Sequence, residues 1–278
     1  MGKLIQYCTN ASKFDGEWRW QAAGMGYIIE TDNRHYIVVD GGLERVDAEN
    51  LISMLTDLSG ALPTVDLWII THPHLDHYGA LKFILSEEEL SSQVIIKKIC
   101  KSFPDEFTWG NGRVLDDARI LNGLLDGAKE SEIFVPNAGD VLDIDGYEVK
   151  FFFTYKDATV LSDPNELSLV FSVRGSNKSV MFTGDAYENG LSIVYRKHKD
   201  DLSPLKCDYV QLAHHGLNGG YTYFYKAVGA SVALVPISVS GDRAMKVPEE
   251  LRGHHNLYAQ SLASSVIKAF TGTVTLEL

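Results

Sequence analysis

The segment Thr71-His72-Pro73-His74-Leu75-Asp76-His77-Tyr78-Gly79 holds the residue types in this chain that are best suited to chemistry. Three imidazoles and a carboxylate lie close together there, and each needs a hydrogen-bond or metal partner once it is removed from water. A metal cluster satisfies all four groups. Zinc, the default for His-rich sites, and also manganese or iron accept such nitrogen and oxygen ligands. The alternative is a solvated, His-rich loop.

An apolar run, Leu67 to Ile70, precedes this segment and predicts a buried strand. Side chains alternate along an extended chain, so the loop leaving the strand presents His72 and His74 on one side. Residues 76–77 are expected where the chain turns. Gly79 then frees the backbone to enter the next helix.

The pattern His-x-His-x-Asp-His after an apolar strand resembles the signature of the metallo-β-lactamase superfamily. The resemblance implies an α/β (α+β) fold, a four-layer αββα sandwich, with two divalent metal ions in a shallow cleft between the sheets. It also implies hydrolysis of an ester, thioester, amide or phosphodiester. The motif is specific for fold and metal and says little about substrate.

Bulk composition favours one acidic domain. The chain has 278 residues, and a hydrophobic content of 45% is ample for a core. No linker, repeat or low-complexity segment interrupts it, which predicts a single domain over residues 1–278. The formal charge of -12 argues against a broad phosphate-binding surface for long nucleic acid. Bound metal ions could still create a local positive site.

The three cysteines, Cys8, Cys100 and Cys207, form no C-x-x-C pair and are odd in number, which indicates reduced thiols and a cytoplasmic setting. They are expected to behave as small buried hydrophobes. Residues 1–12 lack the apolar core of a signal peptide, and no later run approaches the ~18 apolar residues of a membrane span. A soluble chain without membrane association is expected.

A hairpin is predicted before the His-rich segment, from Met25 to Glu30 and from His35 to Asp40. It ends in Asp40-Gly41-Gly42, a turn that would let the backbone approach the site and that again looks like this superfamily. Asp40 is expected either to orient a ligand imidazole or to cap the turn.

Helices and strands alternate through the first half of the chain. The predicted helices span Asp47–Leu58, with Asp47 as N-cap, then Ala80–Leu85 and Asp116–Ala128, with a strand over Val94–Ile99. This alternation places the His-rich loop at the carboxyl end of a strand. The second half is predicted to form a second sheet sharing the same core, from strands Val141–Ile144, Tyr147–Phe153, Leu167–Val173, Val180–Thr183 and Cys207–Leu212.

Two later strand ends supply further candidate ligands. Asp185 follows an apolar strand in a Gly-Asp pair, and the resemblance makes it a bridging ligand of both metals. His214 and His215 leave the next strand and are expected to point to opposite sides. Similarity to relatives favours His215 as the ligand and His214 as its substrate-facing neighbour, with the reverse left open.

The absence of a histidine limits the resemblance to one branch of the superfamily. Between His77 and His198 there is none, although many superfamily hydrolases take a further imidazole from just before the Gly-Asp strand. Asn165 stands in that region instead. With the later Phe-Thr-Gly-Asp, His-His-Gly and Gly-Thr-Val-Thr-Leu segments, this resembles the branch of competence-channel nuclease-like domains and teichoic acid phosphorylcholine esterases. The match runs roughly from Gly24 to Leu278.

The sequence departs from that branch at two places. Leu217 follows His-His-Gly where the branch usually has Ser, and Gly253-His254-His255 replaces a Gly-His-Pro. His254 either contacts a phosphoryl oxygen or lies on the surface at a helix start. Upstream, Trp18 and Trp20 either line a substrate pocket or pack the N-terminal edge.

The resemblance therefore implies a dinuclear metal-dependent hydrolase that cleaves a phosphodiester with metal-activated water. One metal would be held by His72, His74 and Asp185, and the other by Asp76, His77, Asp185 and one of His214 or His215. Asp76 would also orient the nucleophile, while His214, Asn165 and His254 would hydrogen-bond the substrate.

The expected substrate is a small or wall-derived phosphodiester rather than long nucleic acid, and the oligomeric state is left open. The rival hypotheses are a carbon-ester, thioester or lactam hydrolase, a redox di-iron protein, and a metal-binding module without turnover. His74 argues against the di-iron class, whose members carry Glu at that position of the motif.

Overall fold

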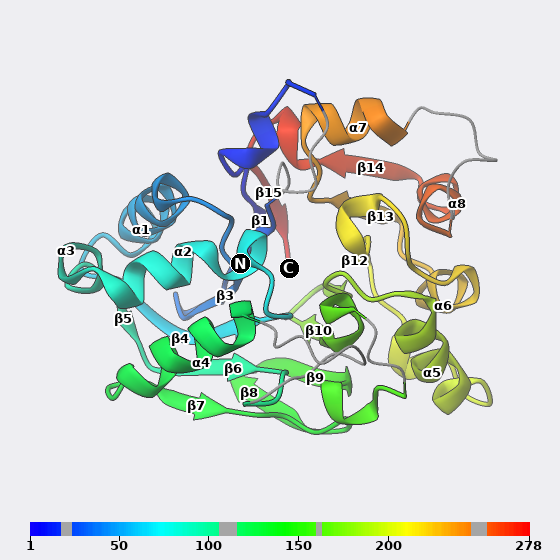
Figure 1. Ribbon diagram of the computed structural model, residues 1–278. Coiled ribbons are helices and arrows are strands. Elements are labelled where there is room, and N and C mark those ends of the chain that lie inside the picture. Colours follow the sequence, from blue (N-terminus) through cyan, green and yellow to red (C-terminus); the bar gives the residue numbers. More distant parts are fainter. Residues whose placement is uncertain (18–23, 106–115, 160–162, 246–254) are drawn as a thin grey trace.

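The computed structural model describes residues 1–17, 24–105, 116–159, 163–245 and 255–278. Its strands form two sheets, each with helices against its outer face, as Figure 1 shows. This four-layer αββα sandwich is the fold that the resemblance to the metallo-β-lactamase superfamily implies.

The first sheet has the order β15-β1-β2-β3-β4-β6-β7, with β5 also paired to β4. Strands β3, β4, β6 and β7 run parallel, whereas β15, β1, β2 and β3 pair antiparallel. The bounds are β1 Lys3–Gln6, β2 Gly26–Glu30, β3 Tyr36–Asp40, β4 Thr64–Ile70, β5 Ile95–Ile96, β6 Lys98–Lys101, β7 Glu132–Phe134 and β15 Val274–Glu277.

The second sheet has the order β14-β13-β12-β11-β10-β9-β8, parallel from β14 to β11 and antiparallel from there on. Its strands are β8 Val141–Ile144, β9 Tyr147–Phe153, β10 Val170–Arg174, β11 Ser179–Phe182, β12 Tyr209–Gln211, β13 Val232–Val235 and β14 Ser265–Lys268. The predicted strand over Leu167–Val173 starts too early, because Leu167 ends a 3-10 turn, η3, over Pro164–Leu167.

The helices divide between the two outer faces. Helices α1, α2, α3 and α4 accompany the first sheet, while α5, α6 and α8 lie beside the second, on the opposite side of Figure 1. Their bounds are α1 Arg45–Ser59, α2 Leu75–Ser86, α3 Glu88–Ser91, α4 Asp116–Gly127, α5 Glu188–His198, α6 Thr222–Val228, α7 Val239–Met245 and α8 His255–Leu262. None of the helices in the described part of the chain is long and apolar enough to cross a membrane.

Strand β4 shows how the sequence builds two of the hydrophobic layers. Trp68 and Ile70 pack with the α1 and α2 side chains on the outer face. Leu67 and Ile69, which alternate with them, pack between the two sheets against residues such as Phe171. All four are fully buried. A strand covered on both faces explains why the run before the His-rich segment is continuously apolar.

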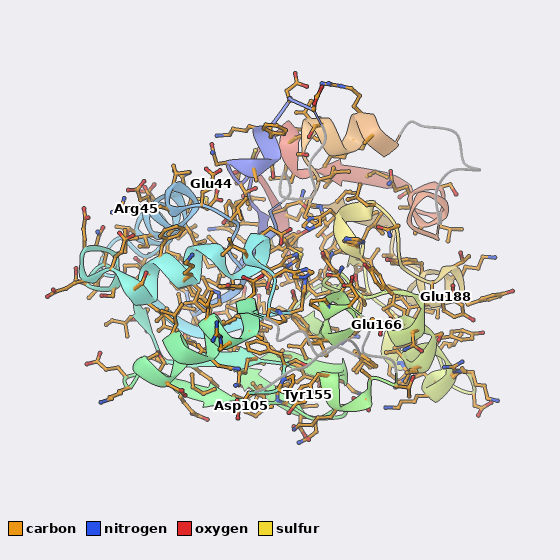
Figure 2. The ribbon with its side chains drawn as sticks, in the orientation of Figure 1. Glu44, Arg45, Asp105, Tyr155, Glu166 and Glu188 are labelled. Carbon is orange, nitrogen blue, oxygen red and sulfur yellow. The ribbon has the colours of Figure 1, made fainter. Side chains whose placement is uncertain are left out.

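Two helix starts differ from the prediction. Helix α1 begins at Arg45 with Glu44 as N-cap, and both lie at the start of that helix in Figure 2. Asp47, the predicted N-cap, is instead the third helical residue, whose carboxylate accepts the backbone N–H of Glu44 at 3.0 Å in a capping box. Helix α2 begins at Leu75, so residues 76–77 lie in its first turn and not in a turn before it.

Glycine is required at position 79 for a different reason from the one predicted. It lies inside α2 and its backbone needs no special freedom. A side chain there would place Cβ 2.3 Å from the carbonyl oxygen of Leu43, so glycine allows the helix to lie against the loop after β3.

Candidate metal centre

The site lies where several strands of both sheets end. In the first sheet, β3 ends at Asp40 and β4 leads into His72, while α2 carries Asp76 and His77 in its first turn. In the second sheet, β11 leads into Asp185, and β12 leads into His214 and His215. The parallel strands of both sheets therefore direct their carboxyl ends to one region, the usual place for sites in such sheets.

Two groups of potential metal ligands form there, His72, His74 and Asp185, and Asp76, His77 and His215. In the first group, Nε2 of His72 lies 3.0 Å from Nδ1 of His74 and 3.9 Å from Oδ2 of Asp185. In the second, Nε2 of His215 lies 3.1 Å from Oδ2 of Asp76 and 3.3 Å from Nε2 of His77.

Asp185 joins the two groups. Its Oδ1 lies 3.3 Å from Nε2 of His77, and its Oδ2 lies 3.4 Å from Nε2 of His215 and 3.9 Å from Nε2 of His72. The residue is only 2% exposed, so its carboxylate cannot be satisfied by bulk water. Its backbone N–H donates to Oγ of Ser168 at 3.0 Å, which helps to hold the residue in place.

Hydrogen bonds behind the imidazoles decide which nitrogens face the cluster. Nδ1 of His77 lies 2.7 Å from Oδ2 of Asp40, and Nδ1 of His215 lies 2.7 Å from the carbonyl oxygen of Pro236. Carboxylate and carbonyl oxygens only accept, so each Nδ1 carries the proton. In the neutral rings the Nε2 atoms are therefore the acceptors, and they face each other, which is the arrangement of imidazoles that a cation requires.

Thr71 completes this support. Its backbone N–H and its hydroxyl both donate to Asp40, each at 2.8 Å, and its Oγ1 lies 3.2 Å from Nδ1 of His72. Asp40 therefore orients a candidate ligand imidazole, one of the two alternatives that the sequence left open. Its φ of 57° lies in the left-handed region, which few residues other than glycine adopt.

The residues fit a pair of divalent cations. Oδ1 of Asp185 is buried and accepts no hydrogen bond from the described residues, even though imidazole nitrogens surround the carboxylate. Buried acceptors that converge without donors between them are stabilised by cations. The donor set of imidazole nitrogen and carboxylate oxygen suits zinc and related transition metals.

The electrostatics of the site also favour positive charge. Burial opposes an imidazolium at His215, but Asp185 and Asp76 outweigh it and raise the pKa of His215 to about 10. Burial likewise opposes the charged form of Asp185, yet His215 and His77 hold the pKa of this carboxyl well below its usual value. The carboxylates that attract protons here would equally attract a metal ion.

The side chains of His214 and His215 lie in different places, but they do not do so through the alternation of an extended chain that was expected. Both residues lie in the 3-10 turn η5, His214–Gly216, with φ of 51° and 55°, so the chain is no longer extended. His215 reaches the second ligand group. His214 lies outside both groups, its Nδ1 donates to the carbonyl oxygen of Asn218 at 2.9 Å, and its ring borders the adjoining cavity.

A cavity of about 500 Å³ opens onto the ligand groups, a size that suits a small molecule. Asn165 and His214, both predicted to touch substrate, line it together with the unpredicted Tyr187. Tyr187 follows Asp185 by two residues, and nothing in the sequence pattern singled it out. The described lining residues are Leu43, His74, Leu75, Asp76, Asp117, Asp163, Asn165, Asp185, Tyr187, His214, His215, Leu217 and Asn218.

Three residues that the sequence analysis considered for the site, Trp18, Trp20 and His254, lie outside the described residues. The cysteines take no part in the site. Cys100 and Cys207 are buried free thiols, as predicted, whereas Cys8 is only half-buried.

Solved structures with this fold differ widely in sequence. The metallo-beta-lactamase fold protein YhfI from Bacillus subtilis is 14% identical, with a TM-score of 0.60 over 99% of this chain and 100% of that one. A diphosphatase from the PhnP family is 11% identical, with a TM-score of 0.54 over 100% and 98%. CmlA, a diiron beta-hydroxylase from Streptomyces venezuelae, is 13% identical, with a TM-score of 0.58 over 99% of this chain and 54% of its own.

At these identities the similarity concerns the fold alone. A search of curated protein sequences gave no match. The family model described as the metallo-beta-lactamase superfamily matches residues 22–266, which include both ligand groups and the whole cavity lining. The chain therefore belongs to the metallo-beta-lactamase superfamily.

Proposed function

We propose that this protein is a dinuclear metal-dependent hydrolase that cleaves a small phosphodiester. The observation that carries the proposal is that Asp185, a member of one ligand group, also lies within 3.4 Å of two members of the other, beside a cavity of substrate size. The proposed ligands are His72, His74 and Asp185 for one ion, and Asp76, His77, His215 and again Asp185 for the other. Zinc is the proposed metal, with manganese and iron as alternatives.

Two bound divalent cations would supply Lewis-acid stabilisation of charge on the phosphoryl oxygens and would make a water molecule easier to deprotonate. Hydrolysis adds that water across the ester linkage. The water oxygen forms a bond to phosphorus, the bond from phosphorus to the leaving oxygen breaks, and the leaving oxygen departs with a proton as an alcohol. Asp76, at the cavity wall, is placed to take the proton from the water.

The remaining cavity residues would orient the substrate. The proton on Nδ1 of His214 is committed to Asn218, so the ring is held at a fixed angle at the cavity wall. Asn165 and Tyr187 form the wall beyond it, with Nδ2 of Asn165 donating to the Tyr187 hydroxyl at 2.9 Å. These polar groups could bind the oxygens and substituents of a tetrahedral phosphoryl group without any change of fold.

Two further considerations support phosphodiester chemistry. First, the chain resembles a branch that includes phosphorylcholine esterases, and it lacks the third imidazole that better-known carbon-ester hydrolases of the superfamily use. Second, one of the solved structures with this fold is a diphosphatase. A small or wall-derived phosphodiester also suits the charge of -12 better than long nucleic acid does.

The test is to purify the protein, measure its metal content, and compare turnover of bis(p-nitrophenyl) phosphate, a thioester and a cephalosporin. We expect about two metal ions per chain and turnover of the phosphodiester. Asp185→Asn should lose both metal and activity, whereas Asp126→Asn, an exposed change on α4, should lose neither. Turnover of only the thioester or the cephalosporin would replace the proposal with carbon-ester or lactam hydrolysis. Metal binding without any turnover would favour a binding module.

A further inference from the structure

Three leucine side chains border the cavity beside the ligand groups. Leu43 follows the turn after β3, Leu75 is the first residue of α2, and Leu217 follows η5. Each of them is half-buried, so part of its apolar surface remains open to the cavity. A ligand that removes this surface from water gains free energy in proportion to the apolar area covered.

Two of these leucines lie next to the ligands along the chain. Leu75 stands between His74 and Asp76, which belong to different ligand groups, and Leu217 lies two residues after His215. Leu75 also packs against the hydrophobic cluster between the first sheet and its helices, and Leu217 packs against the corresponding cluster of the second sheet. The proposed metal centre therefore has an apolar side chain beside it on each half of the fold.

The leucines on the first-sheet side form one preformed surface. The backbone N–H of Leu43 donates to Oδ2 of Asp47 at 2.9 Å, and the carbonyl of Leu43 lies against Gly79 of α2. Leu75 precedes Gly79 by four residues, about one helical turn, so it lies on the helix face that is directed to Leu43. A surface that is already in place costs a ligand little in ordering.

The charged residues of the cavity disfavour a second anionic group on the substrate. No described lining residue is Lys or Arg, whereas Asp117 and Asp163 belong to neither ligand group and leave negative charge at the wall. Asp117 accepts a hydrogen bond from the Tyr78 hydroxyl at 3.1 Å, and Asp163 accepts the backbone N–H of Asn165 at 2.9 Å, which fixes where each carboxylate lies. The phosphoryl group would be attracted to the metal ions, and any further anionic group would be repelled.

We infer that the substrate is a phosphodiester with an uncharged, apolar substituent, an alkyl or aryl group, and that Leu43, Leu75 and Leu217 bind this group. The inference rests on the proposed function, since it assumes that the phosphoryl group faces the two ligand groups. The apolar group covers the leucines, so affinity rises with the apolar area that the substituent buries. Nucleic acid does not meet this description, because the substituents on both sides of the scissile phosphate carry further phosphates.

Phosphinates test binding without turnover, because they have the charge and the tetrahedral shape of a phosphodiester but no ester bond. Calorimetry with the metal-loaded protein would compare dimethylphosphinate, butyl(methyl)phosphinate and (3-hydroxypropyl)methylphosphinate. The last two have nearly the same shape and differ in one terminal group. We expect affinity to rise about two- to fourfold for each CH₂ added between the first two compounds. The hydroxypropyl compound should bind at least about fourfold more weakly than the butyl compound.

Substitutions test whether the leucines are responsible. Leu43→Asn and Leu217→Asn nearly keep the size of the side chain and remove its apolar surface. Each should lower the ratio of the butyl to the dimethyl affinity at least about threefold. The matched control is Leu62→Asn, because this leucine is 54% exposed and is not among the lining residues, and the control should keep the full ratio. Binding of dimethylphosphinate by a variant shows that its metal centre is intact, and the comparison of compounds on wild-type protein decides where a variant fails to fold.

Several outcomes would overturn the inference. It is wrong if wild-type protein binds no phosphinate, if affinity does not rise with chain length, if the hydroxypropyl compound binds as tightly as the butyl compound, or if both cavity variants keep the full ratio. Turnover of bis(p-nitrophenyl) phosphate without an effect of chain length would retain the proposed function and remove only the inference about the substrate. An effect of chain length in a protein that turns over only the thioester or the cephalosporin would retain the apolar surface and overturn the phosphodiester.

Discussion

Oδ2 of Asp40 lies 2.7 Å from Nδ1 of His77, and neither side chain is exposed to solvent. The contact connects the end of β3 to the first turn of α2, across 37 residues of sequence. It fixes the proton of His77 on Nδ1 and turns Nε2 towards Asp185. One carboxylate outside the ligand groups thus determines which nitrogen a metal ion would meet.

Asp40→Asn tests this relationship. An amide has one acceptor oxygen, whereas the carboxylate accepts from Thr71 through its backbone and hydroxyl and from His77. The variant must leave at least one of these donors facing an amide N–H. We expect metal affinity to fall by about 10- to 100-fold, measured by competition with a chromophoric chelator. Equal affinity in wild-type and variant protein, with an unchanged fold, would show that Asp40 only caps the turn.

Substitution of Gly79 distinguishes the effect of packing on stability from the effect of helix propensity. In Gly79→Ala, the new Cβ would meet backbone atoms of Leu43 and Gly42 at 2.3 to 2.7 Å, and backbone cannot move aside as a side-chain tip can. We expect a loss of about 1–3 kcal/mol in the free energy of unfolding, measured with urea. The matched control is Gly123→Ala in α4, where nothing lies within 4 Å of the new Cβ and the variant should gain up to about 1 kcal/mol. Equal stability of the two variants would refute the packing argument.

Asp66 should contribute to the acid sensitivity of the fold. Burial opposes its charged form, but Lys97, the backbone N–H of Tyr36 and His35 outweigh this and lower its pKa. A carboxyl whose folded-state pKa is depressed stabilises the protein fully above its unfolded value of about 4, and this contribution is lost as pH falls through the folded-state pKa. Asp66→Asn should therefore be less stable than wild type at pH 7, and the gap should close below about pH 4. A gap that is independent of pH would show that charge is not the cause.

The sequence predicts the fold and the ligand groups well where a local pattern carries the information. The apolar run of β4 predicts a strand covered on both faces, and the His-rich segment at its end supplies two members of each ligand group. Asp185 and His215 come from elsewhere in the chain. From their positions after strands alone, both would be interpreted as ordinary turn residues. Only the resemblance to a family identified them as candidate ligands.

The remaining features depend on contacts between distant segments. The carbonyl of Pro236 behind His215 and the position of Asp117 in the cavity come from tertiary packing, which no periodicity encodes. Asp47 has the residue type of an N-cap, but the neighbouring Glu44 occupies that position and Asp47 completes the capping box. Gly79 shows the same limit, because the need for glycine comes from Leu43 in another segment and not from a turn in its own.

The neighbouring histidines give the sharpest test of the proposed centre. Nε2 of His215 lies within 3.4 Å of Asp76, His77 and Asp185, while His214 lies in the cavity wall. His215→Ala should therefore lower the metal content from about two ions to about one, as measured by elemental analysis. His214→Ala should keep both ions and raise the KM for the phosphodiester, because it removes only a substrate-facing group.

Both positions have positive φ, so the two alanine variants carry a similar backbone penalty and each serves as the control of the other. Retention of metal in His215→Ala together with its loss in His214→Ala would reverse the assignment. Loss of metal in both would mean that the turn η5 has to be intact for any ligand to be positioned, and unfolding measurements on the metal-free variants would then show a common loss of stability.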